Sequence, residues 1–421
     1  MKKHILLVAG LLYSCFTYSQ TENTEQQVVK NRQNSAEQQK KPYVIMISVD
    51  GFRYDYAKKY HAQNLLNLAQ EGVSAKGMIP SYPSITFPNH YTMVTGLYPA
   101  HHGLVSNRFY DRNYKSTYSY KGKTTTEGKW YGGTPLWVLA EQQQMLTASF
   151  YWVGSEADIK NTYPTYYYKY NEKISIHDRI QTVVNWLNLP PEIRPHLITF
   201  YFPEVDHAGH TYGPNAPETR KQVLFIDSAV NELNKAVKTT GLPVNFVLVS
   251  DHGMTQIDTE RPLALPAIAT DTSKFITSFE DILVELYAKD ATQIQRTYTA
   301  LKKEAKGYDV YLRSKTPGRW HYDAANDRFN RIGDILLVPH WPQVFAMPKR
   351  KPNPGVHGYD PKKVKDMQAI FYAWGPAFGQ HETIKPFTNV NIYPMVAQLL
   401  GLPITEPVDG DESLAKKVLK K

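Results

Sequence analysis

Seven residues of this chain have the side-chain types and the spacing expected of a site that holds two metal ions. They are Asp50, Thr86, Asp206, His210, Asp251, His252 and His357. The three carboxylates follow apolar stretches typical of buried strands, at residues 43–49, 197–202 and 244–249. Open α/β sheets display reactive side chains just beyond the carboxyl ends of such strands. Since a buried carboxylate is costly unless it is paired or binds metal, the pattern indicates a two-metal hydrolase.

The candidate ligands divide into two sets. Asp206 and His210 are four residues apart and can turn towards one ion, with His357 as a third ligand. The other ion would be held by Asp50, Asp251, His252 and the Thr86 oxygen. Mixed imidazole and carboxylate ligands favour zinc over magnesium or calcium. Two zinc ions about 4 Å apart can clamp a phosphoryl group between an attacking and a leaving oxygen.

Thr86 is the candidate nucleophile. Pro88 suits the first turn of a helix, so Thr86 would lie at a helix N-terminus, where free N–H groups favour an anion. A threonine hydroxyl becomes a good nucleophile when coordination to a dication lowers its pKa; the alternative role for Thr86 is that of a helix cap. The nearby histidines are expected to support or pack against the site without binding metal, namely His90, His101, His102 and His207.

Near-continuous apolar strands alternate with helical stretches along the chain. This pattern predicts an α/β fold with a mostly parallel central sheet flanked by helices. Residues 275–345 have their own pattern of strands and a helix, which predicts a small α+β insertion. Residues 106–129 are polar and rich in Tyr and Lys, and are predicted to form a long surface loop.

The two ends of the chain differ from its centre. Residues 1–19 combine Lys2 and Lys3 with a short apolar core and predict a signal peptide. The protein is therefore expected to be exported, periplasmic or secreted, with no membrane span in the mature chain. The single cysteine, Cys15, offers lipoprotein anchoring as an alternative. Polar residues 20–41 predict a flexible linker, residues 42–405 the folded domain, and residues 406–421 a basic tail.

The formal net charge of the 421 residues is +9, and lysines of the C-terminal end contribute to it. A solvated basic surface that also attracts anionic substrates explains such a charge. The sequence lacks zinc-finger spacing and the complete Gly-x-x-x-x-Gly-Lys-Ser/Thr motif of a phosphate loop. No stable nucleic-acid complex is therefore expected.

Several motifs, in this order, resemble those of the nucleotide pyrophosphatase/phosphodiesterase family of the alkaline phosphatase superfamily. They are Val49-Asp-Gly-Phe-Arg53, Thr86-Phe-Pro-Asn-His-Tyr91, Asp206-His-Ala-Gly-His210, Ser250-Asp-His-Gly-Met254 and His357-Gly358, and the resemblance covers nearly all of residues 42–403. It implies an alkaline-phosphatase-like sandwich as the phosphodiesterase domain, two zinc ions per chain and Thr86 as nucleophile. It also implies that Asn107 donates a hydrogen bond to a phosphate oxygen.

The resemblance also bears on the substrate. Phe87 and Tyr170 match positions that sandwich a nucleobase in the nucleotide-splitting members, and such stacking contributes about 1–3 kcal/mol per base. This implies cleavage of nucleotides and dinucleotides to nucleoside 5′-monophosphates through a threonine-linked nucleotidyl intermediate. The alternatives are a choline-type phospholipid-headgroup phosphodiesterase, a phosphomonoesterase of the same superfamily and a nucleotide-binding protein without turnover. A protein that only binds has no need of a nucleophile.

Overall fold

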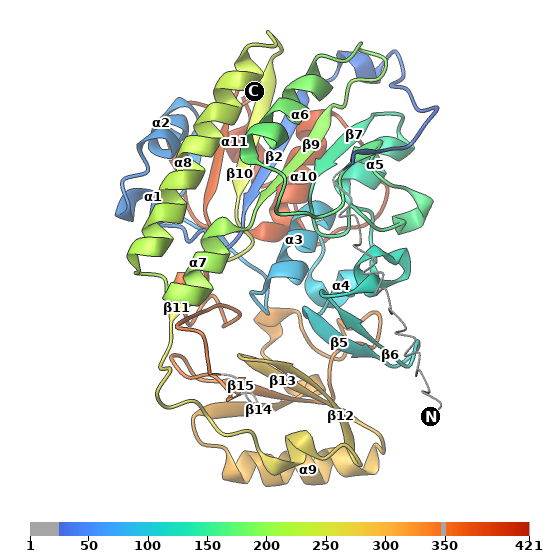
Figure 1. The fold of residues 1–421 in the computed structure, drawn as a ribbon. Helices are drawn as coiled ribbons and strands as arrows, with labels where there is room; N and C mark the ends of the chain where they lie inside the picture. The colour runs from blue at the N-terminus through green and yellow to red at the C-terminus, as the bar shows by residue number, and fades with distance from the viewer. Residues whose placement is uncertain (1–24, 347–350, 421) are drawn as a thin grey trace, which may run out of the picture.

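A mixed sheet of nine strands forms the centre of the molecule (Figure 1). The computed structural model describes residues 25–346 and 351–420. The strand order is β1-β8-β7-β9-β2-β10-β17-β3-β18. The strands, in that order, are Gln27–Val28, Tyr166–Tyr167, Thr147–Phe150, Leu197–Phe202, Tyr43–Val49, Val244–Val249, Phe371–Trp374, Val73–Ala75 and Glu382–Ile384.

The five strands from β8 to β10 are parallel to their neighbours, whereas β1 and β17 pair antiparallel with the sheet. Parallel neighbours place the carboxyl ends of β9, β2 and β10 along one edge. The predicted α/β class with a mostly parallel central sheet is therefore confirmed.

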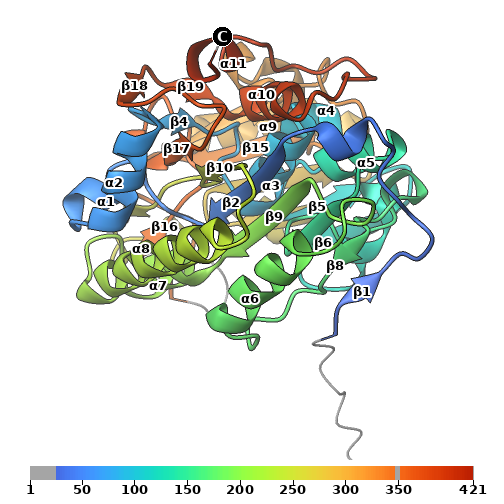
Figure 2. The ribbon, with the colours of Figure 1, turned by 90° about the horizontal axis from the view of Figure 1, so that it is seen from above.

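Helices cover both faces of this sheet (Figure 2). Because successive strand residues point to opposite faces, Ile45 and Ile47 of β2 belong to one core cluster and Val44 and Met46 to another. The first cluster includes α2, α6 and α8, which are Gln63–Glu71, Ile176–Leu187 and Pro217–Lys238. The second includes α3, α5 and α10, which are Thr86–Thr95, Leu136–Gln142 and Ile392–Leu400. Burial on both faces explains why the central strands are apolar along their whole length.

The predicted insertion is a four-stranded antiparallel sheet in the order β12-β13-β15-β14, with the helix α9 beside it (Figure 1). The elements are β12 Phe275–Glu280, β13 Leu283–Ala288, α9 Thr292–Glu304, β14 Tyr308–Leu312 and β15 Ile335–Pro339. It has its own core cluster around residues such as Val284, Leu301 and Ile335. A short hairpin of β5 (Arg108–Asp111) and β6 (Ser116–Ser119) lies between this sheet and the central domain (Figure 1). The predicted loop over residues 106–129 thus contains regular structure.

The prediction of a flexible linker over residues 20–41 is wrong for the part that the structure describes. Strand β1 extends the central sheet, and Asn34 is buried, with its amide group donating to Pro191 O (2.8 Å) and Arg194 O (2.7 Å). Arg32 forms an ion pair with the buried carboxylate of Glu141 at 3.1 Å. Polar side chains hold this segment in place through hydrogen bonds and an ion pair. Its low content of apolar residues therefore gave no sign that it is ordered. The predicted signal peptide and Cys15 lie outside the described residues.

The predicted basic tail over residues 406–421 is also part of the folded domain. Its short helix α11 (Ala415–Val418) packs against α10, and Leu414, Ala415 and Val418 are buried. The apolar residues between the lysines therefore anchor residues 406–420 to the folded domain. Among residues 25–346 and 351–420, no helix is long and apolar enough to cross a bilayer.

A buried carboxyl group, Glu285 of β13, joins the insertion to the central domain. The hydroxyl of Tyr322 lies 3.1 Å from Glu285 Oε1 and 3.0 Å from Val105 O, two residues before Asn107. The hydroxyl of Tyr287 likewise faces Glu285 Oε2 (3.3 Å) and Arg331 O (2.9 Å). Each hydroxyl has one proton but faces two acceptors, so a proton on Glu285 lets one of the two hydroxyls accept from the carboxyl group while it donates to the backbone. Burial raises the pKa of Glu285 from 4.5 to about 7.

This raised pKa predicts a loss of stability with rising pH. The protonated carboxyl contributes its full stabilisation below the unfolded pKa near 4.5 and loses it as pH rises through about 7, a change of about 3 kcal/mol. Glu285→Gln keeps the shape without the charge, so its unfolding free energy should fall less than that of the parent protein between pH 5.5 and 8.5. The exposed Glu232→Gln is the control. Equal pH dependence of parent protein and Glu285→Gln, measured by denaturant unfolding, would contradict the assignment.

Candidate active site

Three carboxylates converge at the carboxyl edge of the parallel strands. Asp50 directly follows β2, Asp251 lies two residues beyond β10, and Asp206 lies in the first turn of α7 (Glu204–Tyr212), which follows β9. Gly51 has a φ of +67°, and a Cβ at this position would lie 2.9 Å from Asp206 Cα. Only a residue without a side chain lets the Asp50 and Asp206 loops approach so closely.

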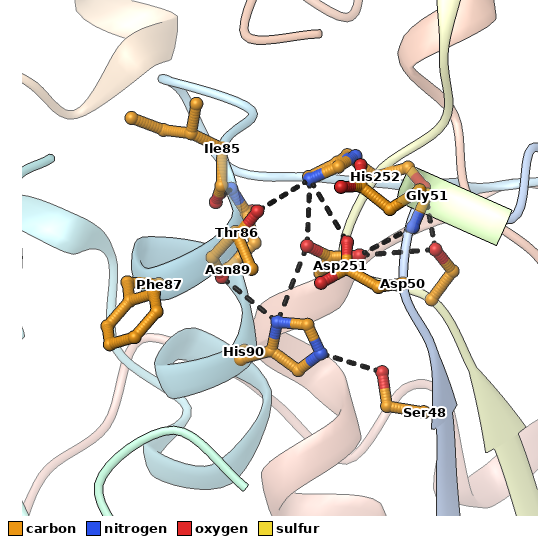
Figure 3. A network of polar contacts seen from close by, with 12 residues as sticks. Ser48, Asp50, Gly51, Ile85, Thr86, Phe87, Asn89, His90, Asp251 and His252 are labelled. Atoms are coloured by element: carbon orange, nitrogen blue, oxygen red, sulfur yellow. Dashed lines mark hydrogen bonds and ion pairs between the residues drawn. The ribbon is translucent and has the colours of Figure 1, made fainter. Parts of the chain in front are cut away.

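Thr86 is the first residue of α3, beside these loops (Figure 3). Its Oγ1 atom lies 3.2 Å from His252 Nε2. The backbone N–H groups of the first turn of α3 have no partner within the helix, so the position favours an anion. The hydroxyl, the helix end and the carboxylates therefore face a common point.

The ligand candidates form two clusters, Asp50 with Asp251 and His252, and Asp206 with His210 and His357. Within each cluster, one ligand atom per residue lies within 4.8 Å of the others. His252 Nε2 is 2.8 Å from Asp251 Oδ2 and 3.6 Å from Asp50 Oδ1 (Figure 3). The ring of His252 stacks on that of His357 with 3.5 Å between centroids, so the two clusters are adjacent.

All three histidines of the clusters use Nδ1 to contact a backbone carbonyl. The partners are Gly355 O for His210 (2.8 Å), Gly253 O for His252 (2.9 Å) and Ser84 O for His357 (3.0 Å). Because a carbonyl only accepts, Nδ1 must carry the proton, and Nε2 of the neutral ring keeps its lone pair. This is the orientation of metal-binding histidines, whose second nitrogen is held by a neighbouring group.

The charge of the site also fits two divalent cations. Asp50 Oδ1, Asp206 Oδ1 and Asp251 Oδ2 are buried and make no hydrogen bond among the described residues. Burial, and then the carboxylates of Asp251 and Asp206, raise the pKa of Asp50 well above its usual range. Burial, His252 and His210 lower the pKa of His357 well below its usual range, so this ring stays neutral as a ligand. Buried carboxylates and neutral imidazoles together match zinc.

A cavity of about 450 Å³ opens beside Thr86 and is lined by Phe87, Asn107 and Tyr170, among others. Asn107 Oδ1 accepts a hydrogen bond from Phe87 N at 3.0 Å, which leaves the NH₂ group of the amide as a donor. The ring of Phe87 packs edge-to-face with Tyr120 at 5.7 Å. Tyr170 is 45% exposed, so both of the aromatic side chains named from the sequence border space that a flat ring can enter.

Several residues of the site have no signal in the sequence. Tyr201 of β9 donates to Asp50 Oδ2 at 2.5 Å and lines the cavity. Glu156 accepts from Tyr170 N at 2.6 Å. The role of Tyr201 depends on which residue of β9 faces the cavity, and strand alternation alone does not reveal this in a strand that is apolar on both faces. Glu156 lies in a turn, where no residue pattern marks its contact with Tyr170. Of the histidines expected to stay outside the ligand sets, His101 pairs with Asp409 and His102 with Thr92.

Comparisons with known proteins agree with this geometry. The family model described as type I phosphodiesterase / nucleotide pyrophosphatase matches residues 44–360. Mouse ectonucleotide pyrophosphatase/phosphodiesterase family member 1 is 33% identical over 400 residues, which are 90% of this chain and 43% of that protein. Venom phosphodiesterase 2 of Crotalus adamanteus is 33% identical over 388 residues, which are 90% and 47% of the two chains. This chain thus spans less than half of the length of these two relatives.

Solved structures are similar over the whole domain. Murine ectonucleotide pyrophosphatase/phosphodiesterase 5 has a TM-score of 0.84 and 28% identity, covering 90% of this chain and 100% of that chain. An inactive threonine-to-alanine variant of the same murine protein, in complex with AMP, matches with the same values.

The α/β fold with two adjacent candidate metal sites matches proteins of the phosphodiesterase class. The chain belongs to the type I phosphodiesterase/nucleotide pyrophosphatase family, within the alkaline phosphatase superfamily. The family resemblance of its motifs is thereby confirmed.

The two ligand clusters predict the metal content. The purified protein should contain close to two zinc ions per chain, and His357→Ala should lose most of one ion, because Asp206 and His210 alone leave one cluster with two protein ligands. His196→Ala, which removes a buried histidine bound to Pro42 O, is the control. Elemental analysis showing one ion in the parent protein, or magnesium in place of zinc, would contradict this prediction.

Proposed function

We propose that this protein is an exported phosphodiesterase that binds two zinc ions and hydrolyses nucleotides and dinucleotides to nucleoside 5′-monophosphates. Thr86 Oγ1 attacks the α-phosphorus, the bond from phosphorus to the leaving-group oxygen breaks, and water then releases the nucleotidyl group from Thr86. When bound, the two ions would lower the pKa of the attacking hydroxyl and offset phosphoryl charge. The NH₂ group of the Asn107 amide donates to a phosphoryl oxygen.

The observation that carries this proposal is the position of the Thr86 hydroxyl. It lies 3.2 Å from His252 Nε2, at the N-terminus of α3, and on the wall of the cavity. A helix cap would need only the hydroxyl and the helix, whereas this hydroxyl also faces a candidate metal cluster. The solved murine relative is an inactive threonine-to-alanine variant in complex with AMP. This agrees with a threonine that acts on nucleotides.

Nucleotides are the favoured substrate class because of the cavity walls. Phe87 lies next to the nucleophile, and Tyr170 contacts Tyr151 and Tyr201 at ring distances of 5.1 and 6.0 Å. A base held between Phe87 and Tyr170 would place the α-phosphorus near Thr86, and the leaving group would contribute less to binding. Export is proposed from the sequence of residues 1–19.

One comparison separates the proposed function from its alternatives. These are a lipid-headgroup phosphodiesterase, a phosphomonoesterase and a nucleotide-binding protein without turnover. The purified protein is assayed in parallel with ATP, glycerophosphocholine and a simple phosphate monoester. The proposal requires ATP to be cleaved to AMP with the highest kcat/KM. Faster cleavage of glycerophosphocholine or of the monoester would assign the function to those alternatives.

The role of Thr86 predicts the effect of two substitutions. Thr86→Ala should abolish hydrolysis of ATP with fold and metal content nearly unchanged, since at most one ligand oxygen is lost, and Thr86→Ser should keep part of the activity. Thr95→Ala removes a buried hydroxyl of the same helix that bonds only to Tyr91 O, and should be nearly neutral for activity. Near-normal turnover by Thr86→Ala, measured as AMP release, would exclude a covalent threonine intermediate.

The proposed base-binding role of Tyr170 predicts a substrate-dependent defect. Tyr170→Ala should lower kcat/KM for ATP by about ten- to a hundredfold, equivalent to about 1–3 kcal/mol of lost stacking. Hydrolysis of bis-nitrophenyl phosphate, which has no base, should be almost unchanged. Tyr163→Ala removes a ring of the same segment that stacks on Tyr167 and does not line the cavity, and serves as the control. Equal losses on both substrates would show that Tyr170 is structural.

A further inference from the structure

His90 connects the turn that carries Thr86 to one of the two metal clusters. It lies in α3, one helical turn after Thr86, and is fully buried. Its Nδ1 atom is 3.0 Å from Thr86 O and 3.4 Å from Asp251 Oδ2, and its Nε2 atom is 2.8 Å from Ser48 Oγ (Figure 3). Both Thr86 and Asp251 are thus within reach of a single ring nitrogen.

The proton positions on His90 follow from its partners. Thr86 O accepts only, so Nδ1 must carry a proton, and this N–H is directed at the carbonyl with Asp251 Oδ2 beside it. A neutral ring then accepts at Nε2 from the Ser48 hydroxyl. Asp251 Oδ2 makes no hydrogen bond and also faces His252 Nε2 at 2.8 Å, so it is the oxygen that a cation in this cluster would meet.

The ring of His90 cannot turn away from these partners. Trp152 and Tyr201 pack edge-to-face against it, each with 5.3 Å between ring centroids. Trp152 Nε1 donates to His90 O at 3.1 Å, and Tyr201 holds Asp50, the third member of the same cluster, through its hydroxyl. The aromatic walls therefore fix the direction of the Nδ1–H group.

We propose that His90 is a positioning residue. Its Nδ1–H group, bonded to Thr86 O, presents its positive end to the Asp251 carboxylate at 3.4 Å and thereby sets the metal affinity of the Asp50–Asp251–His252 cluster. The proposal rests on the proposed function only in that this cluster binds a cation. Because outer groups that orient ligands change metal affinity by about 10- to 100-fold, loss of this N–H should weaken one ion and leave the other in place.

Two substitutions separate this role from simple space filling. The Nδ2 atom of asparagine is bonded to Cγ, as Nδ1 of histidine is, so His90→Asn keeps a donor towards Thr86 O and Asp251. His90→Gln keeps more volume but places its amide one atom further out, where it faces Ser48. If His90 only fills space, His90→Gln should reduce zinc affinity less than His90→Asn does. If His90 has the proposed role, His90→Asn should reduce zinc affinity less than His90→Gln does. His102→Gln is the matched control, because His102 is also fully buried and bonds to Thr92 and Pro88 O, away from both clusters.

The experiment is a zinc titration of the chelator-treated full chain against a chromophoric competing chelator, with no substrate present. His90→Gln should weaken one of two ions by about 10- to 100-fold, whereas His90→Asn should stay within about threefold of the parent protein. His102→Gln should bind both ions normally. Normal binding of both ions by His90→Gln, or an equal loss in His90→Asn, would overturn the proposal.

A second variant keeps the test decisive if His90→Gln does not fold. Ser48→Ala removes only the hydroxyl that orients the ring through Nε2, and should weaken the same ion severalfold. An unchanged affinity in Ser48→Ala would also overturn the proposal. Because the titration does not involve hydrolysis, failure of the nucleotide assay would refute the proposed function without affecting this result.

Discussion

Three carboxylates buried at one edge of a sheet are the constraint on which the rest of this structure depends. Asp50, Asp206 and Asp251 have buried oxygens without hydrogen bonds, and among the described residues their only ion pairs are with histidines. Burial and the two neighbouring carboxylates raise the pKa of Asp50, and such a concentration of like charge destabilises the fold unless cations neutralise it. The neighbouring imidazoles, oriented through their Nδ1 contacts to backbone carbonyls, make the place suitable for divalent cations in particular.

The orientation of those imidazoles is a property of the backbone. Each of the three ring Nδ1 atoms meets a carbonyl from a loop, and two of the three loops are distant in sequence from the histidine, at Ser84 and Gly355. Loops are usually the mobile parts of a fold, but here β16 (Gly355–Val356) pairs with β11 (Thr255–Gln256) and so fixes one of them. The cluster of Asp206, His210 and His357 thus depends on a pair of short strands outside the central sheet.

The substrate side of the site depends on a different group of contacts, which come from the insertion. Arg331 is fully buried, pairs with Asp111 at 2.7 Å and donates to Gly103 O and Trp130 O, near the two ends of the segment that carries Asn107. Tyr322 contacts the same segment at Val105 O, and its hydroxyl also lies against Glu285. The cavity wall is therefore supported from outside the central sheet, and changes in the insertion are expected to reach substrate binding through this segment.

The fold class, the central strands and the two groups of candidate metal ligands could be predicted from the sequence, because each rests on a local pattern. Continuous apolar runs mark strands covered on both faces, and a carboxylate at the end of such a run needs a compensating partner. The same local patterns failed for residues 25–41 and 406–420, which look polar or basic but are held by Asn34, Arg32 and a few buried apolar residues. The folded chain was needed to see that Tyr201 holds Asp50, that His90 lies between Thr86 and Asp251, and that backbone carbonyls orient the rings of the candidate metal ligands. These contacts join atoms far apart in the chain, often main-chain atoms that every residue has, so no residue type or spacing records them.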